Sequence, residues 1–502
     1  MKRSVLTLML AGSLLMRAES WLTFGGDAQR TGWAKNETAI TKDNAKKLGL
    51  QWKLHLDNVA TELTSLTAAI VVENVVIVGG SSDNLYAVDG DTGKILWQKK
   101  FTAEGKPKNP SHWLCHNGLN ATPAVAQEGS SHTVYTIASD GKLHALNVVN
   151  GEDRFPPTQF VPPYSKNWSL NIVDDVLYTT ISQGCNGAKS GVYAMDLKSP
   201  ERAITFFESA PHGGGVWGRG GAAVDSNGVV FAETGDGPYD VEAGKLTDTV
   251  LALSPKQLKL ADYYTPENRA WITKKDLDMG NMSPAIFTFR KWELVAAAGK
   301  EGVIYLLDAK SPGGADHRTP LYRSPLFTNE NADFGGHGFW GAFATSQDPQ
   351  GARWLYAPAW GPRNSAAPAF ARTHGTAAHG SIMAFKVEEK DGAPTLSPAW
   401  ISRDLDVPEP PIVANGIVFA LSSGENVNQT NSEGHILMSK DRATAPAGNA
   451  TLYAFDAATG EELFSSGKTI PEFTHFSGLA ISGGRVYVTT YESNVYAFGL
   501  KK

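Results

Sequence analysis

The chain has 502 residues, of which 42% are hydrophobic and 19% charged, so it carries enough apolar surface to bury a large core. Its 45 basic and 51 acidic side chains give a net charge of −6, and the absence of a long basic run argues against a nucleic-acid partner. The 51 glycines and 13 tryptophans favour many short strands, joined by tight turns, with aromatic packing between sheets.

The first 20 residues have the pattern of a secretory signal peptide. Basic residues at positions 2 and 3 precede an apolar run over 5–16, and small residues follow at a cleavage site. The run is too short to span a bilayer and no later stretch reaches about 20 apolar residues, so we expect no stable membrane insertion. The mature chain would begin near Trp21 and be periplasmic or secreted. The alternative is an uncleaved membrane anchor.

A short motif recurs along the chain with some variation: an apolar residue, an aromatic or other large residue, alanine, and a second apolar residue. Internal self-similarity of this kind indicates a repeat architecture. The shortest spacing between copies fits a four-stranded sheet, and the longer spacings leave room for loop insertions. The eight copies lie at 85–89, 143–147, 192–196, 250–253, 304–308, 382–385, 452–456 and 495–498.

The first repeat predicts four strands, over 67–72, 75–79, 85–89 and 95–99, each bounded by Gly, Asp or Asn. Single sheets of this kind cannot bury both faces, so they must stack radially. The sequence therefore predicts an all-β, eight-bladed β-propeller of four-stranded antiparallel blades, in one domain over 21–502. Two smaller propellers or a pair of sandwiches are the alternative.

The two ends of the chain predict how the ring of blades closes. The eighth repeat stops at Leu500 without an outermost strand, while residues 48–54 resemble a fourth strand that lacks a sheet. We expect the N-terminal strand to complete the last blade, because pairing removes an open edge that would favour aggregation.

Cys115 and Cys185 are the two cysteines of the chain. In an oxidising compartment two cysteines more often form a bridge than remain free. Closing a loop of about 70 residues would stabilise the fold by about 4 kcal/mol. Neither cysteine lies in a Cys-x-x-Cys-His motif, so we expect no haem c.

The segment Tyr86 to Trp97, with the sequence Tyr-Ala-Val-Asp-Gly-Asp-Thr-Gly-Lys-Ile-Leu-Trp, is similar to the tryptophan-docking repeat of the pyrroloquinoline quinone (PQQ) dehydrogenase superfamily. The resemblance extends from about residue 45 to the end of the chain and implies the propeller fold. It leaves the function open, because the same repeat also builds non-catalytic scaffolds such as outer-membrane assembly lipoproteins.

Quinone chemistry would use the mouth of the central channel, where the loops that enter the innermost strands gather. PQQ is flat and carries three carboxylates, so it needs an aromatic floor, cations, a divalent metal and a carboxylate base. The resemblance implies that Trp217 is the floor, Asp236 a Ca²⁺ ligand, Asp278 the base that removes the alcohol proton, and Lys300 the cation at the quinone oxygens. Trp340 lies before an innermost strand and joins the predicted cofactor-binding residues.

The sequence also departs from the family pattern. Cys115 and His116 stand where many of its alcohol dehydrogenases have two adjacent cysteines, and they remain predicted cofactor contacts. The loop over 183–188 has no carboxylate where the family has a glutamate metal ligand, which leaves Asn186 as a substitute. We expect a bridge from Cys115 to Cys185 across the mouth in place of the adjacent-cysteine ring.

The first interpretation is a quinoprotein-like oxidoreductase. It would oxidise an alcohol or sugar-like hydroxyl with PQQ and Ca²⁺ at the mouth, and pass electrons to a separate acceptor. The alternative is a non-catalytic periplasmic binding or assembly scaffold that uses insertions at 360–380 and 422–450 to hold a partner. A metal site built from histidines is a further alternative without support from their spacing. Its candidates are His116, His212, His337 and His475.

Overall fold

The computed structural model describes residues 20–61, 64–108, 115, 119, 121–425, 437 and 448–501. The predicted signal peptide, His116 and most of the insertion at 422–450 therefore lie outside the described residues. Within the described part of the chain, no helix is long and apolar enough to cross a membrane.

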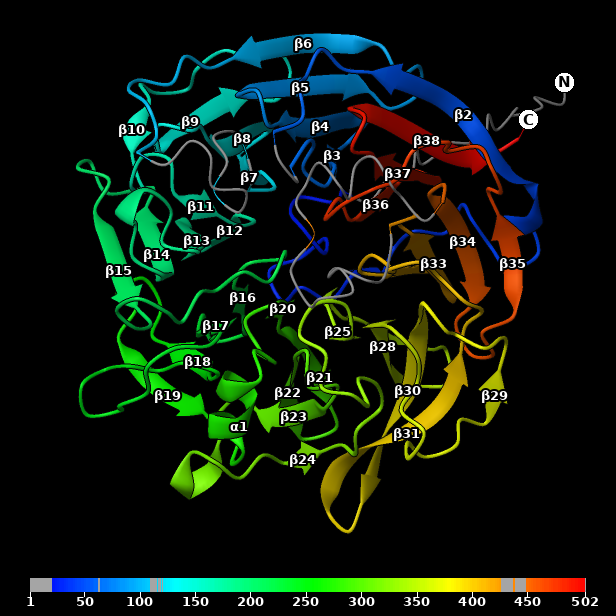
Figure 1. Cartoon of the computed structure of the whole chain (residues 1–502). Coiled ribbons are helices and arrows are strands. Elements are labelled where there is room, and N and C mark those ends of the chain that lie inside the picture. The colour runs from blue at the N-terminus through cyan, green and yellow to red at the C-terminus, as the bar shows by residue number, and fades with distance from the viewer. Residues whose placement is uncertain are drawn as a thin grey trace, which may run out of the picture.

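Eight antiparallel sheets stand as blades around a central axis, which confirms the predicted propeller (Figure 1). Each alanine-containing repeat forms the third strand of one blade. These strands, such as β5 (Asn84–Asp89) and β38 (Asn494–Leu500), are buried along almost their whole length, because both of their faces pack against neighbouring blades. Small alanine side chains in the middle of these strands permit that close approach.

Five blades have four strands each, whereas blades three and seven have five and blade six has six. Blade one contains β3 (Ile70–Val72), β4 (Val75–Gly80), β5 and β6 (Ile95–Lys100), and blade two contains β7 (Ala124–Glu128), β8 (Ser131–Ile137), β9 (Lys142–Asn147) and β10 (Thr158–Gln159). Blade three contains β11 (Lys166–Asn167), β12 (Asn171–Val173), β13 (Val176–Ser182), β14 (Gly191–Asp196) and β15 (Ile204–Glu208). Blade four contains β16 (Ala223–Val224), β17 (Val230–Glu233), β18 (Val250–Leu253) and β19 (Leu260–Tyr264).

Blade five contains β21 (Ala285–Phe289), β22 (Trp292–Ala298), β23 (Ile304–Asp308) and β24 (Tyr322–Arg323). Blade six contains β25 (Gly338–Phe339), β27 (Ala344–Gln347), β28 (Arg353–Trp360), β29 (Arg372–Thr373), β30 (Gly380–Lys390) and β31 (Ala393–Ile401). Blade seven contains β1 (Trp33–Ala34), β32 (Ile412–Ala414), β33 (Ile417–Ser422), β34 (Thr451–Asp456) and β35 (Glu462–Ser465), and blade eight contains β36 (Leu479–Ser482), β37 (Arg485–Thr489), β38 and β2 (Leu48–His55). Outside the blades, β20 (Met282–Ser283) pairs with β26 (Gly341–Ala342), and the helices are α1 (Arg269–Lys274), η1 (Ala45–Lys47), η2 (Cys185–Gly187) and η3 (Gly314–Asp316).

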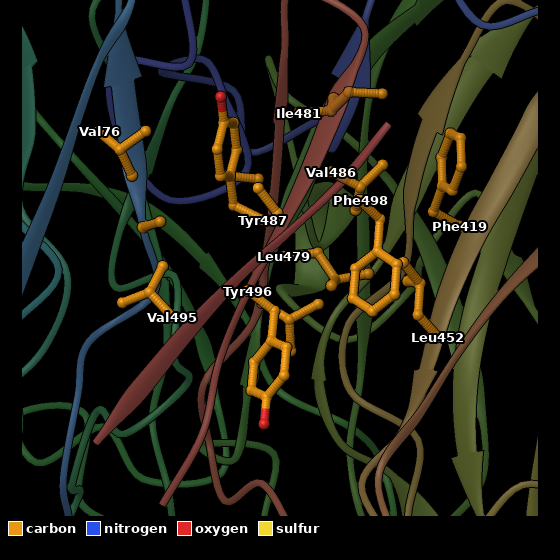
Figure 2. Packing of buried hydrophobic residues seen from close by; sticks show 14 of the residues in the cluster. Val76, Phe419, Leu452, Leu479, Ile481, Val486, Tyr487, Val495, Tyr496 and Phe498 are labelled. Atoms are coloured by element: carbon orange, nitrogen blue, oxygen red, sulfur yellow. The ribbon is translucent and has the colours of Figure 1, made fainter. Parts of the chain in front are cut away.

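The ring closes as the sequence predicts. Strand β2 pairs antiparallel with β38, with Leu48 opposite Leu500, and supplies the outermost strand of blade eight. Figure 2 shows the core on both sides of this blade, where Phe498 lies between Val76 of blade one and Phe419 of blade seven. Burying each such side chain stabilises the fold by about 1.5–3 kcal/mol, so the closure joins the two ends of the chain firmly.

The N-terminal segment over residues 21–32, which we call the N-terminal plug, runs inside the ring of blades (Figure 1). It forms hydrogen bonds with the innermost strand, or the residues next to it, of one blade after another. The bonds are Trp21 N to Val71 O, Val125 N to Leu22 O, Thr23 Oγ1 to Leu170 O, Val224 N to Ala28 O, Ile286 N to Gln29 O, Thr345 N to Thr31 O, and Val413 N to Gly32 O. The plug therefore contacts blades one to seven in turn.

Phe24 of the plug lies directly below the axial mouth. Its ring packs against Ala68 and Ala342, and it also lies close to the α-carbons of Gly220 and Gly478. These residues follow the mouth loops of four different blades by only a few positions. The plug thus forms the base on which the mouth is built, a role that the repeat pattern gives no sign of.

Candidate functional site

Asp278, the predicted base, lies at the centre of a polar cluster at the axial mouth. Its Oδ2 accepts a hydrogen bond from Trp217 Nε1 at 2.8 Å, and its Oδ1 lies 2.6 Å from Lys300 Nζ. The Asp278 side chain is 3% exposed, so this bond and ion pair operate largely away from water. The structure therefore brings together three of the residues that the sequence singled out, from the loops of two blades.

Two further carboxylates lie beside Asp278. One oxygen each of Asp236, Asp276 and Asp278 lies within 4.8 Å of the others, the spacing expected around a metal ion. Lys300 Nζ also lies 3.0 Å from Asp276 Oδ1, whose side chain is 51% exposed. Asp236 thus lies in a group of carboxylates that could hold a cation, and Asp276 is a further member of this group.

Asp276 stands two residues before Asp278 in the sequence, and this closeness is the signal that marks it. It lies in the turn that follows α1, with a positive φ of 54°. In Asp276-Leu277-Asp278 the intervening leucine is fully buried, whereas both carboxylates reach the same ammonium.

Two of these carboxylates, Asp276 and Asp278, contact the Lys300 ammonium, and the third, Asp236, lies close to them. Burial and the neighbouring Asp278 charge raise the pKa of Asp236. Burial also raises the pKa of Asp276 to about 6, helped by Asp278 and opposed by Lys300. Although burial disfavours its charge, the pKa of Lys300 lies above its ordinary value because of the two carboxylates it binds. An excess of acid over base remains, and it favours a bound cation or a retained proton.

An aromatic cluster covers one side of these carboxylates. Lys300 Nζ lies 5.2 Å from the Trp217 ring centroid, and the Trp217 ring meets Trp340 edge to face at 5.5 Å. Trp340 in turn stacks on Trp360 at 4.2 Å, and both rings are buried. Trp217 is only partly buried, so it is the ring available to a flat ligand, with Trp340 supporting it from the side.

Gly235 leaves room beside the cluster. A β-carbon at this position would lie 2.9 Å from Asp278 Oδ2 and 3.4 Å from Trp217 Nε1. Any side chain would therefore crowd the hydrogen bond between these two residues. The Thr-Gly-Asp-Gly loop that carries Asp236 consequently needs glycine at this point.

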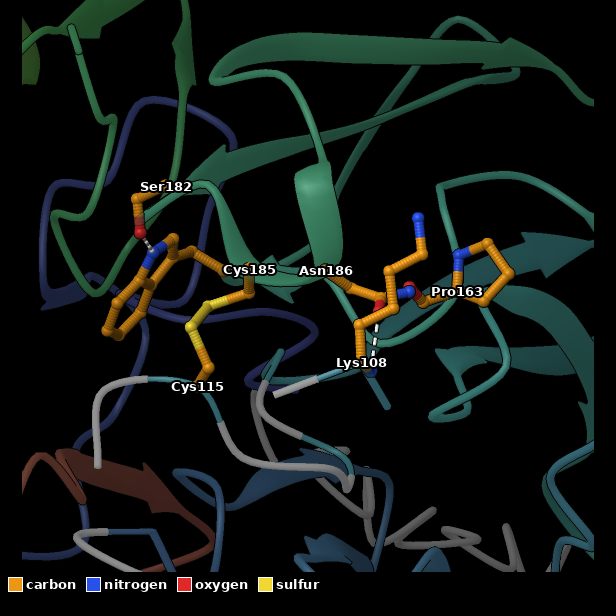
Figure 3. Close-up of a disulfide and its surroundings, with 7 residues drawn as sticks. Lys108, Cys115, Pro163, Ser182, Cys185 and Asn186 are labelled. Carbon is orange, nitrogen blue, oxygen red and sulfur yellow. Dashed lines mark hydrogen bonds between the residues drawn. A yellow bond between two sulfur atoms is a disulfide. The ribbon is translucent and has the colours of Figure 1, made fainter. Parts of the chain in front are cut away.

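Cys115 and Cys185 form a disulfide, as the sequence predicts (Figure 3). The bridge joins the loop that enters blade two to the loop between the second and third strands of blade three. Ser182, at the end of β13, accepts a hydrogen bond from Trp168 Nε1 at 2.8 Å, so a further tryptophan lies next to the bridged loop.

Asn186, the predicted second metal ligand, uses its amide to hold loops together. Its Oδ1 accepts a hydrogen bond from Lys108 N at 2.8 Å, and its Nδ2 donates to Pro163 O at 2.9 Å (Figure 3). A role in binding a metal would require these bonds to break. The three aspartates are a more complete ligand set.

The predicted histidine site is not assembled among the described residues. His475 Nδ1 lies 2.9 Å from Glu425 Oε2, and His337 Nδ1 lies 3.8 Å from Asp333. Over the described ranges, the group of metal-ligating side chains that the structure brings together consists of aspartates. His116 lies outside those ranges.

Comparison with known proteins gives relatives of two kinds. Residues 27–205 match the family model described as outer membrane protein assembly factor BamB. The BamB of Yersinia pestis is 28% identical over 103 residues, or 20% of this chain and 24% of that protein. The quinohemoprotein alcohol dehydrogenase of Comamonas testosteroni is 26% identical over 198 residues, or 38% of this chain and 26% of that protein. The chain thus matches about a quarter of the length of either relative.

Two solved structures are similar in fold to this chain over almost its whole length. The crystal structure of the Comamonas testosteroni enzyme has a TM-score of 0.61 at 16% identity and covers 96% of this chain and 80% of its own. A europium-containing methanol dehydrogenase has a TM-score of 0.66 at 13% identity, covering 96% and 98% of the two chains. At such identities the likeness concerns the fold.

The fold and the repeat together define the class of protein: an eight-bladed β-propeller built from PQQ-like repeats, as the sequence predicted. Within that class, its relatives include quinoprotein alcohol dehydrogenases as well as an assembly factor.

Proposed function

We propose that the protein is a periplasmic quinone-dependent oxidoreductase that oxidises an alcohol or sugar-like hydroxyl and passes electrons to a separate acceptor. The observation that carries the proposal is the position of Asp278, a buried carboxylate bound by Trp217 and Lys300 and flanked by two further acids. A structural ion pair needs only one carboxylate, whereas a cation site needs several oxygen ligands.

The residues at the mouth fit a flat, anionic cofactor. Trp217 offers a partly exposed ring, Lys300 places a positive charge over that ring, and Gly235 puts no side chain beside Trp217 and Asp278. PQQ, when bound, would supply a two-electron acceptor for the alcohol carbon. Trp340 would hold Trp217 in place, and the bridged Cys115 would border the site.

Asp278 would take the proton of the substrate hydroxyl on a carboxylate oxygen. Its pairing with Lys300 keeps both groups oriented, and the closed surroundings strengthen their electrostatic effect. Asp236 and Asp276 would hold Ca²⁺ with Asp278, and the ion would supply positive charge next to the reacting oxygen.

The second candidate is a non-catalytic assembly scaffold, favoured by the match of residues 27–205 to the assembly-factor model. A scaffold has no need to bind a quinone. Titration of the purified protein with PQQ and Ca²⁺, followed by absorbance, separates the two: binding at micromolar concentration supports the oxidoreductase, and absence of binding supports the scaffold.

Asp278→Asn tests the proposed base. We expect dye reduction with alcohols to fall by about 100-fold or more, because the amide cannot accept the proton, while PQQ affinity changes by less than about threefold. Asp262→Asn is the matched control, since Asp262 is a carboxylate on the outer strand of the neighbouring blade that pairs with His317. Equal activity of Asp278→Asn and the wild type would rule out Asp278 as the base.

A further inference from the structure

Three basic side chains at the axial mouth are paired with acids among the described residues. The pairs are Lys300 with Asp276 and Asp278, Arg219 with Glu409, and His475 with Glu425. Lys166 differs: the described residues provide its ammonium with neither a carboxylate nor another hydrogen-bond acceptor.

Lys166 is held at the mouth by blade three. It lies in β11, opposite Ser182 of β13, and its Nζ lies 5.2 Å from the centroid of the Trp168 ring. Trp168 is itself fixed by its hydrogen bond to Ser182. The lysine is therefore directed over an aromatic face rather than extended freely into water.

An ammonium in this position is unfavourable without a counter-ion. Loss of water around it lowers the pKa of Lys166 to about 7. The ring face of Trp168 recovers only part of the lost solvation. A bound anion would supply the rest, as Asp276 and Asp278 do for Lys300.

Aromatic contacts connect Lys166 with the carboxylate cluster. Successive ring centroids are separated by 6.4 Å from Trp168 to Phe476, 6.4 Å from Phe476 to Trp360, 4.2 Å from Trp360 to Trp340, and 5.5 Å from Trp340 to Trp217. One lysine lies over each end of this series, Lys166 over Trp168 and Lys300 over Trp217. Lys300 is already neutralised, so Lys166 is the end that lacks an anion.

We propose that Lys166 and the face of Trp168 form an anion subsite that binds a carboxylate of the ligand held at the mouth. The inference rests on the proposed function, because it concerns the same mouth. The carboxylate belongs either to the quinone cofactor or to a substrate that bears an acid group as well as a hydroxyl. Both sources present the same chemistry to Lys166.

The test uses Lys166→Met, which keeps the length of the side chain over Trp168 and removes its charge, together with Lys166→Arg, which keeps the charge. Lys386→Met is the matched control, since Lys386 Nζ lies 5.1 Å from the Trp354 ring, where β28 and β30 of blade six pair. All variants are compared in the full-length protein with Ca²⁺ present.

In the cofactor arm, PQQ and its trimethyl ester are titrated by absorbance. If the cofactor supplies the carboxylate, Lys166→Met weakens PQQ binding by about 10-fold or more and leaves ester binding unchanged. Lys166→Arg stays within about threefold of the wild type. In the substrate arm, kcat/KM is compared for 4-hydroxybutanoate and 1-butanol. If the substrate supplies the carboxylate, Lys166→Met lowers kcat/KM for 4-hydroxybutanoate but not for 1-butanol, and its affinity for PQQ is unchanged.

A Lys166→Met protein that matches Lys386→Met in both arms overturns the inference. Failure of the proposed function gives a different result, in which the wild type does not bind PQQ at all. In that case the subsite is tested with benzene-1,2,4-tricarboxylate as an anionic probe, whose binding is followed by tryptophan fluorescence. Weaker binding to Lys166→Met retains the anion subsite, and equal binding to the wild type and this variant rejects it.

Discussion

Lys300 illustrates how single residues acquire their properties at this site. Its side chain is 6% exposed, a condition in which a lone lysine tends to lose its proton. Two carboxylates reverse that tendency for Lys300, whereas the part of the chain that the structure describes gives Lys166 no such partner, and its pKa falls to about 7. The pKa values of two lysines over tryptophan rings at one mouth are thus shifted in opposite directions, because only Lys300 is bound by acidic neighbours.

The raised pKa of Asp276 predicts a pH dependence of cation binding. Below its pKa of about 6 the carboxyl group is protonated and cannot act as a ligand, so affinity for Ca²⁺ should rise between pH 5 and pH 7 and then level off. Terbium luminescence excited through Trp217, in competition with Ca²⁺, measures this affinity. In Asp276→Asn the cation should bind about 10-fold or more weakly, with less change over the same pH range. Affinity that is constant from pH 5 to pH 7 would contradict the assignment.

At the scale of the element, one contact between blades is repeated with little change. A tryptophan on an outer strand donates its Nε1 hydrogen to a carbonyl in the turn of the next blade, and its ring lies against a glycine with positive φ. The pairs are Trp52 with Gly90 and Gly93, Trp97 with Val148 and Gly151, and Trp400 with Ala457 and Gly460. This contact is the physical basis of the repeat recognised in the sequence.

The contact predicts that the two glycines Gly151 and Gly129 respond differently to alanine. Both have positive φ, of 71° and 62°, so each substitution carries a backbone cost of about 1–2 kcal/mol. At Gly151 the new β-carbon would also lie 2.8 Å from Trp97 Cδ2, whereas at Gly129 it would meet nothing within 4 Å. Urea denaturation should show Gly151→Ala to be less stable than Gly129→Ala by about 1–3 kcal/mol. Equal losses would mean that the tryptophan moves away without cost.

At the scale of the whole molecule, the N-terminal plug lies inside the ring of blades and forms the base of the mouth. Arg30 of the plug is buried and bonds the carbonyls of Phe24, Leu170 and Ala222, so it links the plug to blades three and four. Arg30 is 1% exposed, and burial lowers the pKa of its guanidinium to about 9. The mouth loops are consequently supported from below by a single segment.

Removal of the Phe24 ring should therefore weaken the whole molecule. Phe24→Ala is expected to lower the free energy of unfolding by about 3–5 kcal/mol, because the cavity it leaves is bordered by several blades that cannot all move inward. Phe206→Ala is the control, since Phe206 lies on an outer strand and is only partly buried. Denaturant midpoints of the two variants give the comparison. A loss no larger than that of the control would show that the plug is dispensable for stability.

Sequence reasoning succeeded where a residue acts through its neighbours in the chain. The alternation of apolar residues, the turns and the repeated alanines specify a strand and its buried faces locally, and eight copies then permit one closed arrangement. The pairing of Leu48 with Leu500 followed because a missing strand and a strand without a sheet complete each other. The bridge between Cys115 and Cys185 followed from the count of cysteines and the predicted compartment.

The candidate site was predicted less completely. Trp217, Asp278 and Lys300 were singled out and are in contact, whereas Asp276 had no assigned role and the amide of Asn186 proves to bind loops. Distances between side chains of different loops depend on where each blade ends, and local patterns do not contain that information. The proposed roles of these residues remain predictions.

The sequence by itself determined the propeller, its order of blades and its closure, because the repeat encodes hydrophobic faces and turns that leave few ways to bury them. Only the tertiary structure decided which acids share Lys300, that Lys166 lies over the Trp168 ring, and how the N-terminal plug supports the mouth. Such relations arise between segments hundreds of residues apart, where the energy of an ion pair or a ring contact depends on its distance and on the exclusion of water.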